Sequence, residues 1–413
     1  MCYNRKLSDP TIGIRKETYG MKWTVGMLTA ALAAAGSGMA WAGPREQVDA
    51  GWAKCMELRW SPKTSLVYER APEDVRPAKA FDDGPGYYRF QEGVPGKNTY
   101  GEGLADCALV CGTALSGLVD RWAAAPDAET NELAAKVARG VLNLATLHGF
   151  RGFVARGVCA EDGKSVCSLS SRDQYTHWLH GLYRYVKSGM ADAAFAKEFA
   201  AEAANVAAFM KAKCTPERNW NFGMCDGSAD PRGICTMWGP DLAPHEQARL
   251  PMIYLAAWDL TGDRRWKDEY EKYADEALDK SQGMADERET GRMPCYSLLQ
   301  AQCSFELLRA IEKDPVRVKK LEAAMAATAR VAANRAKVTL ANPKKPFYGM
   351  CFDGELSLTM AMWPAATDAQ LRANFLSQVV NREDLQKAGT CRNAHVLAAW
   401  WRAERLSGSH PVP

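Results

Sequence analysis

One short stretch of the chain combines five kinds of polar side chain that can do chemistry. Residues 170–177 read SSRDQYTH, which gives a carboxylate, an imidazole, a guanidinium, an amide and a phenol within eight positions. Asp173 and His177 are four residues apart, so they share one face of a helix. Capping of a helix accounts for the two serines and for a carboxylate near the positive end of the helix dipole, but not for the other groups. We therefore expect Asp173 to be a catalytic acid or base, and the neighbouring side chains to orient the substrate: Arg172, Gln174, Tyr175 and His177.

A second pair of carboxylates, Glu102 and Asp106, also has the four-residue spacing of one helix face. Enzymatic hydrolysis of a glycosidic bond needs two carboxyl groups across the bond, one protonated and one ionised. Glu102 or Asp106 on one helix and Asp173 on a neighbouring helix would meet that need. The alternative is that these side chains only stabilise a helix N-terminus, a reading that suits Glu102 best when it is taken alone.

Aromatic side chains gather in the loops and at the expected helix starts. Tyr100 and Trp220 are two of them, and His245 follows a similar loop. Sugar rings present apolar faces that stack on aromatic rings, and ligand sites combine an apolar lining with a few polar groups. We include Tyr100 and Trp220 as substrate-binding candidates, with packing inside the loops as the alternative. His245, which lies four residues after Asp241, is a further candidate.

The apolar residues recur with helical spacing almost throughout the chain, and the alternation typical of strands is rare. This periodicity predicts twelve helices, and Asp127, Asp192, Asp314 and Asp368 are expected N-caps. The expected ranges are 46–59, 100–123, 128–147, 170–188, 193–213, 243–261, 264–283, 293–312, 315–337, 353–364, 368–381 and 392–407.

Short and long connections alternate between these helices. Short turns such as 189–192 and 262–263 join antiparallel neighbours, whereas long connections such as 60–99 and 214–242 link one hairpin to the next. Five hairpins follow, and the first and last helices complete a sixth. The pattern predicts an all-α fold, an (α/α)6 toroid with all long loops at one end. A regular solenoid is a poorer match because the repeat lengths vary widely.

The chain contains thirteen cysteines, of which twelve follow residue 42. An even number of cysteines in an exported protein indicates disulfides, which here would staple the long loops. The spacings contain no CxxC pair and no finger-like histidine spacing, so we expect no metal bound through cysteine. Cys159 with Cys167, and two of Cys214, Cys225 and Cys235, could close loops, but the connectivity stays open. The disulfide candidates are Cys55, Cys107, Cys111, Cys159, Cys167, Cys214, Cys225, Cys235, Cys295, Cys303, Cys351 and Cys391.

The N-terminal region has the features of a signal peptide for secretion. Lys22 precedes the apolar run 23–35, and the small-x-small sequence 40–42 fits a cleavage site before Gly43. We expect translation to begin at Met21, residues 1–42 to be removed, and residues 43–413 to form one domain in a secreted or periplasmic protein. A membrane anchor is the alternative, but the run is short for a bilayer and no later stretch is longer.

Composition excludes several other classes of function. The formal net charge of +3 gives no electrostatic footprint for nucleic acid. The sequence has neither a phosphate-binding glycine loop nor the GxSxG elbow of α/β serine hydrolases. We expect no cofactor and no metal, and the oligomeric state stays open.

The hairpin succession resembles the six-hairpin glycosidase superfamily over most of residues 46–407, and it is also similar to related polysaccharide lyases. The sequence segments that carry the resemblance are Tyr100-Gly101-Glu102-Gly103 at a helix start, residues 152–157 and residues 171–175. The resemblance implies a carbohydrate substrate and acid/base chemistry by carboxyl groups.

Three functions remain open on the sequence. The first is a glycoside hydrolase in which Asp173 works with Asp106 or Glu102. The second is a lyase acting on uronate-containing glycans, in which Tyr175 or His177 removes a proton and Arg172 neutralises the uronate. The third is a binding module for glycans or proteins, in which the polar helix starts are only caps.

Overall fold

A computed structural model of the chain separates into Met1–Ala42 and Gly43–Pro413. The predicted signal peptide lies outside the described residues. The structure describes residues 44–407 apart from 69–70, 73–86, 92–93, 98–105, 161–162, 164–165, 168, 226, 231–232, 287–292, 343–352 and 382–392.

The described part is mostly helical, which confirms the all-α prediction. Five short strands, β1 to β5, form two small antiparallel sheets in the long connections. The strands are Trp60–Ser61, Leu66–Val67, Tyr87–Gln91, Val94–Lys97 and Val166–Cys167. The α-helices are α1 Pro44–Arg59, α2 Cys107–Ala124, α3 Ala128–Thr146, α4 Arg172–Lys187, α5 Ala193–Lys213, α6 Arg249–Thr261, α7 Arg264–Ser281, α9 Cys295–Ile311, α10 Pro315–Ala341, α11 Asp353–Met362, α12 Ala369–Val380 and α14 Asn393–Ser407.

The helix starts follow the capping chemistry of the sequence. Asp127, Asp192, Asp314 and Asp368 each accept a hydrogen bond from a backbone N–H of the first turn, as predicted. Two starts differ from the prediction. Asp106 has a left-handed backbone (φ 69°), so α2 begins only at Cys107, and residues 243–248 form turns, so α6 begins at Arg249.

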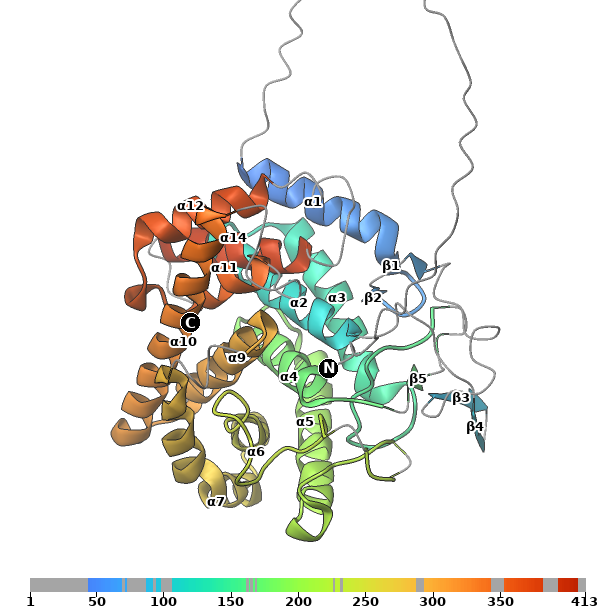
Figure 1. Ribbon diagram of the computed structural model, residues 1–413. Coiled ribbons are helices and arrows are strands. Elements are labelled where there is room, and N and C mark those ends of the chain that lie inside the picture. The colour runs from blue at the N-terminus through green and yellow to red at the C-terminus, as the bar shows by residue number, and fades with distance from the viewer. Residues whose placement is uncertain are drawn as a thin grey trace, which may run out of the picture. The chain divides into compact units, whose positions relative to one another are not determined.

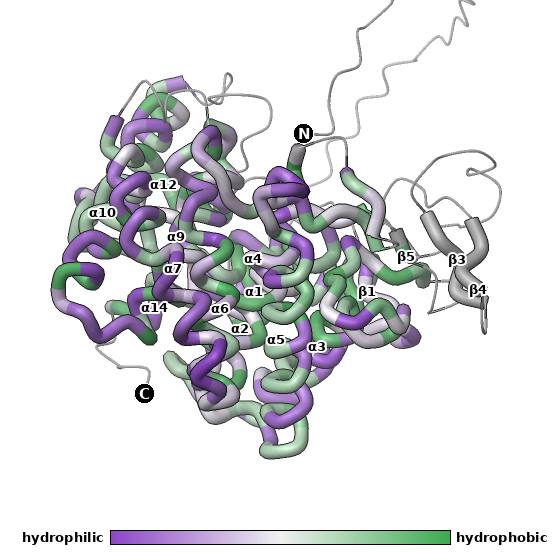
Figure 2. The backbone as a smooth tube through the Cα atoms, turned by 90° about the horizontal axis from the view of Figure 1, so that it is seen from below, coloured by the Kyte–Doolittle hydropathy of each residue, from purple (hydrophilic) through white to green (hydrophobic). Residues whose placement is uncertain are grey.

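Six helices lie at the centre, namely α2, α4, α6, α9, α11 and α14, and the other six cover them (Figure 1). Each central helix contacts the next one, and α14 contacts α2. The central α11 is buried along its whole length, whereas α7 buries one face and is hydrophilic elsewhere (Figure 2). Burial on all sides is typical of a helix enclosed by others, and a one-sided stripe is typical of a covering helix.

Glycines allow the central helices to approach closely. A Cβ at Gly112 of α2 would lie 2.2 Å from the backbone oxygen of His177 in α4. A Cβ at Gly117 would lie 2.8 Å from Ala398 of α14, and one at Gly354 of α11 would lie 2.8 Å from His395. Such distances forbid any side chain, so these glycines fix the spacing of α4, α2, α14 and α11.

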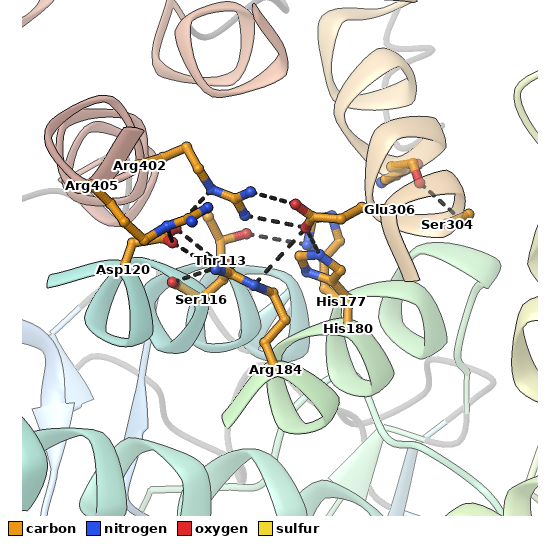
Figure 3. Close-up of polar contacts among 11 residues, drawn as sticks. Thr113, Ser116, Asp120, His177, His180, Arg184, Ser304, Glu306, Arg402 and Arg405 are labelled. Carbon is orange, nitrogen blue, oxygen red and sulfur yellow. Dashed lines mark hydrogen bonds and ion pairs between the residues drawn. The ribbon is translucent and has the colours of Figure 1, made fainter. Parts of the chain in front are cut away.

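A buried ion cluster joins the last helix, α14, to α2. Asp120 of α2 is fully buried and accepts hydrogen bonds from Arg402 and Arg405 of α14 at 2.8 and 2.6 Å, and from Arg184 of α4 at 2.6 Å. Arg402 also donates to Glu306 of α9, so it lies between the two carboxylates (Figure 3). Burial alone would raise the pKa of Asp120, but the three guanidinium groups outweigh it and lower that pKa to about 2.

The cysteines depart in part from the disulfide prediction. The thiols of Cys111 and Cys235 donate to the backbone oxygens of Val67 and Ser170. Cys214 and Cys303 are also buried thiols, and burial raises the pKa of both. These four cysteines form no disulfide in this structure, and all four side chains are buried. Cys351, Cys391 and the side chain of Cys167 lie outside the described residues.

No described helix is both long enough and apolar enough to cross a membrane.

Replacing Asp120 by Asn should destabilise the fold, because three buried guanidinium groups lose their shared countercharge. Breaking a buried ion pair costs about 3–5 kcal/mol in unfolding free energy. The pKa of Asp120 is lower in the folded chain than in the unfolded one, so its contribution is present above about pH 4 and is lost as the pH falls towards 2. Urea unfolding of Asp120→Asn should therefore differ most from the parent near pH 7 and least near pH 2.

The matched control is Asp268→Asn, which removes an exposed carboxylate paired with exposed Arg264. Its unfolding curve should overlay that of the parent, since exposed pairs contribute little. An equal, small effect of both substitutions would contradict the role given to Asp120.

Candidate functional site

The first turns of the central helices bring a second set of polar side chains together, and Tyr296 at the start of α9 lies among them. Burial raises the pKa of Tyr296 to about 12, helped by the negative charges of Asp173 and Glu355 and, more weakly, Glu246. Arg249 acts in the opposite direction on the same phenol. Groups from α4, α6 and α11, and from the turn before α6, are therefore near enough to this phenol at the start of α9 to act on its pKa.

Asp173, the catalytic candidate, is in the first turn of α4 with its side chain 29% exposed. Arg249 donates to it at 2.6 Å and donates with its other terminal nitrogen to Gln300 of α9 at 2.7 Å. Desolvation would raise the pKa of Asp173, but the charge and hydrogen bond of Arg249 lower it to about 2. Asp173 is therefore ionised at neutral pH and has a fixed orientation.

Asp106, its predicted partner, has a different role in the geometry. It precedes α2 in the left-handed conformation and accepts from Arg156 at 2.5 Å and from Gln174 at 2.7 Å. Gln174 is fully buried, so the amide joins the starts of α2 and α4. Asp106 thus lies beside the start of α4, and hydrogen bonds from Arg156 and Gln174 fix its side chain.

Arg172 and His245 meet at Glu246. Arg172 donates to Glu246 and to the backbone oxygens of Gly233 and Thr236, so it fastens the loop before α6. His245 lies 3.6 Å from Glu246, and burial lowers the pKa of His245 to about 4. The imidazole is therefore neutral at pH 7.

Two further imidazoles line the interior. His177 shares a hydrogen bond of 3.1 Å with Thr113 of α2, and burial holds the pKa of His177 well below its usual range. His395 of α14 lies 3.9 Å from Glu355 of α11, and both side chains are almost fully buried. The close contact at Gly354 brings α11 and α14 together at this point.

Other predicted residues lie elsewhere. Tyr175 is 1% exposed, its hydroxyl accepts from the Val154 N–H at 3.1 Å, and its ring meets Phe222 edge-on. Tyr175 is thus a core residue, since it occupies the opposite face of α4 from the site. Trp220 is half-buried in its loop against Gly239, and no described contact joins it to Asp173. Tyr100 and Glu102 lie outside the described residues.

Six members of the site are not among the residues predicted from the sequence, namely Glu246, Arg249, Tyr296, Gln300, Glu355 and His395. Tyr296 and Gln300 stand among apolar residues, whereas Glu246 and Arg249 belong to the polar run 245–249. One signal was present, because Tyr296 and Gln300, like His245 and Arg249, have the four-residue spacing of one helix face.

Several buried polar atoms in the site have no hydrogen-bond partner in the described part of the chain. They are Nε2 of His177, Nε of Arg249, Nε2 of Gln300 and Oε1 of Gln174. Buried polar groups are normally satisfied, so these atoms indicate space for water or for a hydroxyl-rich ligand. Within the described residues, no group of three or more His, Cys, Asp or Glu side chains could hold a metal ion.

Replacing Arg249 by Met should raise the pKa of Asp173 above about 2, because the substitution removes the strongest group that opposes its desolvation. A pH titration of 13C-labelled aspartate side chains by NMR measures this directly, with Asp173→Asn used for assignment. Arg309→Met, which removes a surface partner of Glu322, is the control and should leave the Asp173 resonance unchanged. An unshifted Asp173 in Arg249→Met would remove Arg249 from its positioning role.

No protein-family model matches the chain, and no curated protein matches it. The assignment of a function therefore depends on the chemistry of the site alone.

Proposed function

We propose that this chain is an exported glycoside hydrolase whose central and covering helices form an (α/α)6 toroid. The observation that supports this most is that the charges of Asp173 and Glu355 both act on one phenol, that of Tyr296, so two carboxyl groups lie near the first turn of α9. Hydrolysis of a glycosidic bond requires such a pair. The closed succession of contacts among the central helices, together with the alternation of short and long connections, supports the toroid.

Asp173 is the ionised member of the pair. Its hydrogen bond from Arg249 keeps it charged and oriented, so it can accept a proton from an attacking water or attack the sugar itself. Glu246 is unsuited to the other role because Arg172 donates to it. Glu355 is the proton donor in this proposal, since the imidazole of His395 beside it can exchange protons. The proton passes from Glu355 to the leaving oxygen as the bond to the sugar carbon breaks.

The polar atoms without partners suit a sugar. Hydroxyl groups both donate and accept, so the hydroxyls of a sugar can pair with donors and with acceptors among these atoms. The predicted signal peptide places this reaction outside the cytoplasm, where oxidation could form disulfides among those cysteines that are not enclosed thiols.

A lyase is the second candidate, because the charge of Arg249 acts on the phenol of Tyr296, so a base and a guanidinium lie near each other. Arg249 would neutralise a uronate and Tyr296 would remove the neighbouring proton. Two observations favour the hydrolase. Arg249 is already engaged by Asp173, and a tyrosine whose pKa is raised to about 12 is a poor base at neutral pH.

The test is a screen of polysaccharides and oligosaccharides with the mature protein, reading reducing ends and the ultraviolet absorbance of unsaturated uronates. We expect reducing ends without that absorbance. Asp173→Asn and Glu355→Gln should each lower kcat at least about a hundredfold. Absorbance of unsaturated uronates would favour the lyase. No activity on any substrate would favour a binding module.

The two roles can be separated with aryl glycosides of the sugar found in the screen. An activated leaving group needs no protonation, so Glu355→Gln should regain activity on such substrates, whereas Asp173→Asn should not. Asp268→Asn serves as the control for a neutralised surface carboxylate and should retain full activity. Recovery by neither variant, or by both, would contradict the assignment of donor and base.

A further inference from the structure

A cavity of about 240 Å³ opens at the other end of the central helices, beside the ion cluster of Asp120. It lies between the last turns of α2, α4, α9 and α14, where the connections are short. The basic lining residues come from α4 and α14, and the apolar ones come from α2 and α9. The basic residues are Arg184, Lys187, Arg402 and Arg405, the apolar ones are Val119, Leu307 and Ala310, and Glu306 adds a carboxylate.

The charges beside this cavity do not balance within the described residues. Three guanidinium groups, those of Arg184, Arg402 and Arg405, meet two carboxylates, those of Asp120 and Glu306 (Figure 3). His180 adds no positive charge to this count at pH 7, because burial lowers the pKa of its imidazole. Four helices end beside the cavity, and the backbone oxygens of each last turn add up to about half a negative charge, so the excess of one positive charge is a count of side chains.

Arg405 uses one of its three side-chain nitrogens in hydrogen bonds to the described residues. Its Nε donates to Asp120 at 2.6 Å, and its two terminal nitrogens make no hydrogen bond to any described residue. Arg402 differs, because all three of its nitrogens donate to Asp120 or Glu306. Arg405 is only 9% exposed and lines the cavity, so its two terminal nitrogens lie beside the cavity.

We propose that this cavity binds a small organic monocarboxylate. The carboxylate accepts two parallel hydrogen bonds from the Arg405 fork, the geometry for which a guanidinium is best suited. One negative charge matches the excess of one guanidinium, whereas a phosphate would carry more. The apolar part of the ligand lies against Leu307 and Ala310. This site shares no residue with the proposed hydrolase site, so either can fail without the other.

The test is calorimetric titration of the full-length mature protein with butanoate, acetate and inorganic phosphate, at constant ionic strength set with chloride. We expect one butanoate per chain, with acetate weaker because it covers less of the apolar wall. Arg405→Met should weaken butanoate binding at least tenfold. Arg139→Met, which removes an exposed arginine paired with Glu198, should not change it.

A second variant guards against loss of folding in Arg405→Met. Ala310→Trp adds bulk at the exposed surface of α9 where it lines the cavity, and it leaves every ion pair in place. It should abolish binding while its far-ultraviolet circular dichroism and Tm stay those of the parent. Binding no stronger than that of chloride, tighter binding of phosphate than of butanoate, or full butanoate binding in folded Ala310→Trp would each overturn the proposal.

Discussion

The buried carboxylate of Asp120 is the constraint on which the arrangement of helices depends. It receives guanidinium groups from α4 and from α14, and the latter are 282 and 285 residues further along the chain. An ionised carboxylate without exposure is tolerated only when such partners surround it. A different neighbour for α2 would leave that charge unpaired. We infer that the cluster contributes less to net stability than to the choice of which helices meet.

The same helices carry the candidate site at their other ends. In α4, Asp173 is in the first turn and Arg184 in the last, and eleven residues of helix span about 16 Å. The glycine contacts at Gly112 and Gly354 set the lateral distances between the helices that carry His177, Glu355 and His395. The packed central helices thus fix the distance between the candidate site at one end and the ion cluster at the other. Neither group of side chains can shift without a change in how these helices pack.

Helical periodicity and capping predicted the helices and most of their starts, because both signals are local. The sequence could also single out Asp173, which stands in a dense polar stretch. It misplaced Tyr175, because spacing shows which residues share a face but not whether that face meets the core or the site. Arg249 and Tyr296 were missed since each depends on partners from distant helices. The ion cluster was missed for the same reason, since Asp120, Arg184 and Arg402 lie in three helices that are far apart in the sequence.

The two ends of the central helices differ in how charge is matched. At the long-loop end, Asp106, Asp173 and Glu246 each have a guanidinium of their own, from Arg156, Arg249 and Arg172. Each of these paired charges has a fixed orientation and needs no further counterion. The polar atoms that still lack a partner there are donors and acceptors that the hydroxyl groups of a neutral ligand can satisfy. At the short-turn end, three guanidinium groups share two carboxylates, and the terminal nitrogens of Arg405 remain as charged donors that an anion would suit best. The two proposed sites therefore differ in ligand preference because the two ends of the helices pair their buried charges differently.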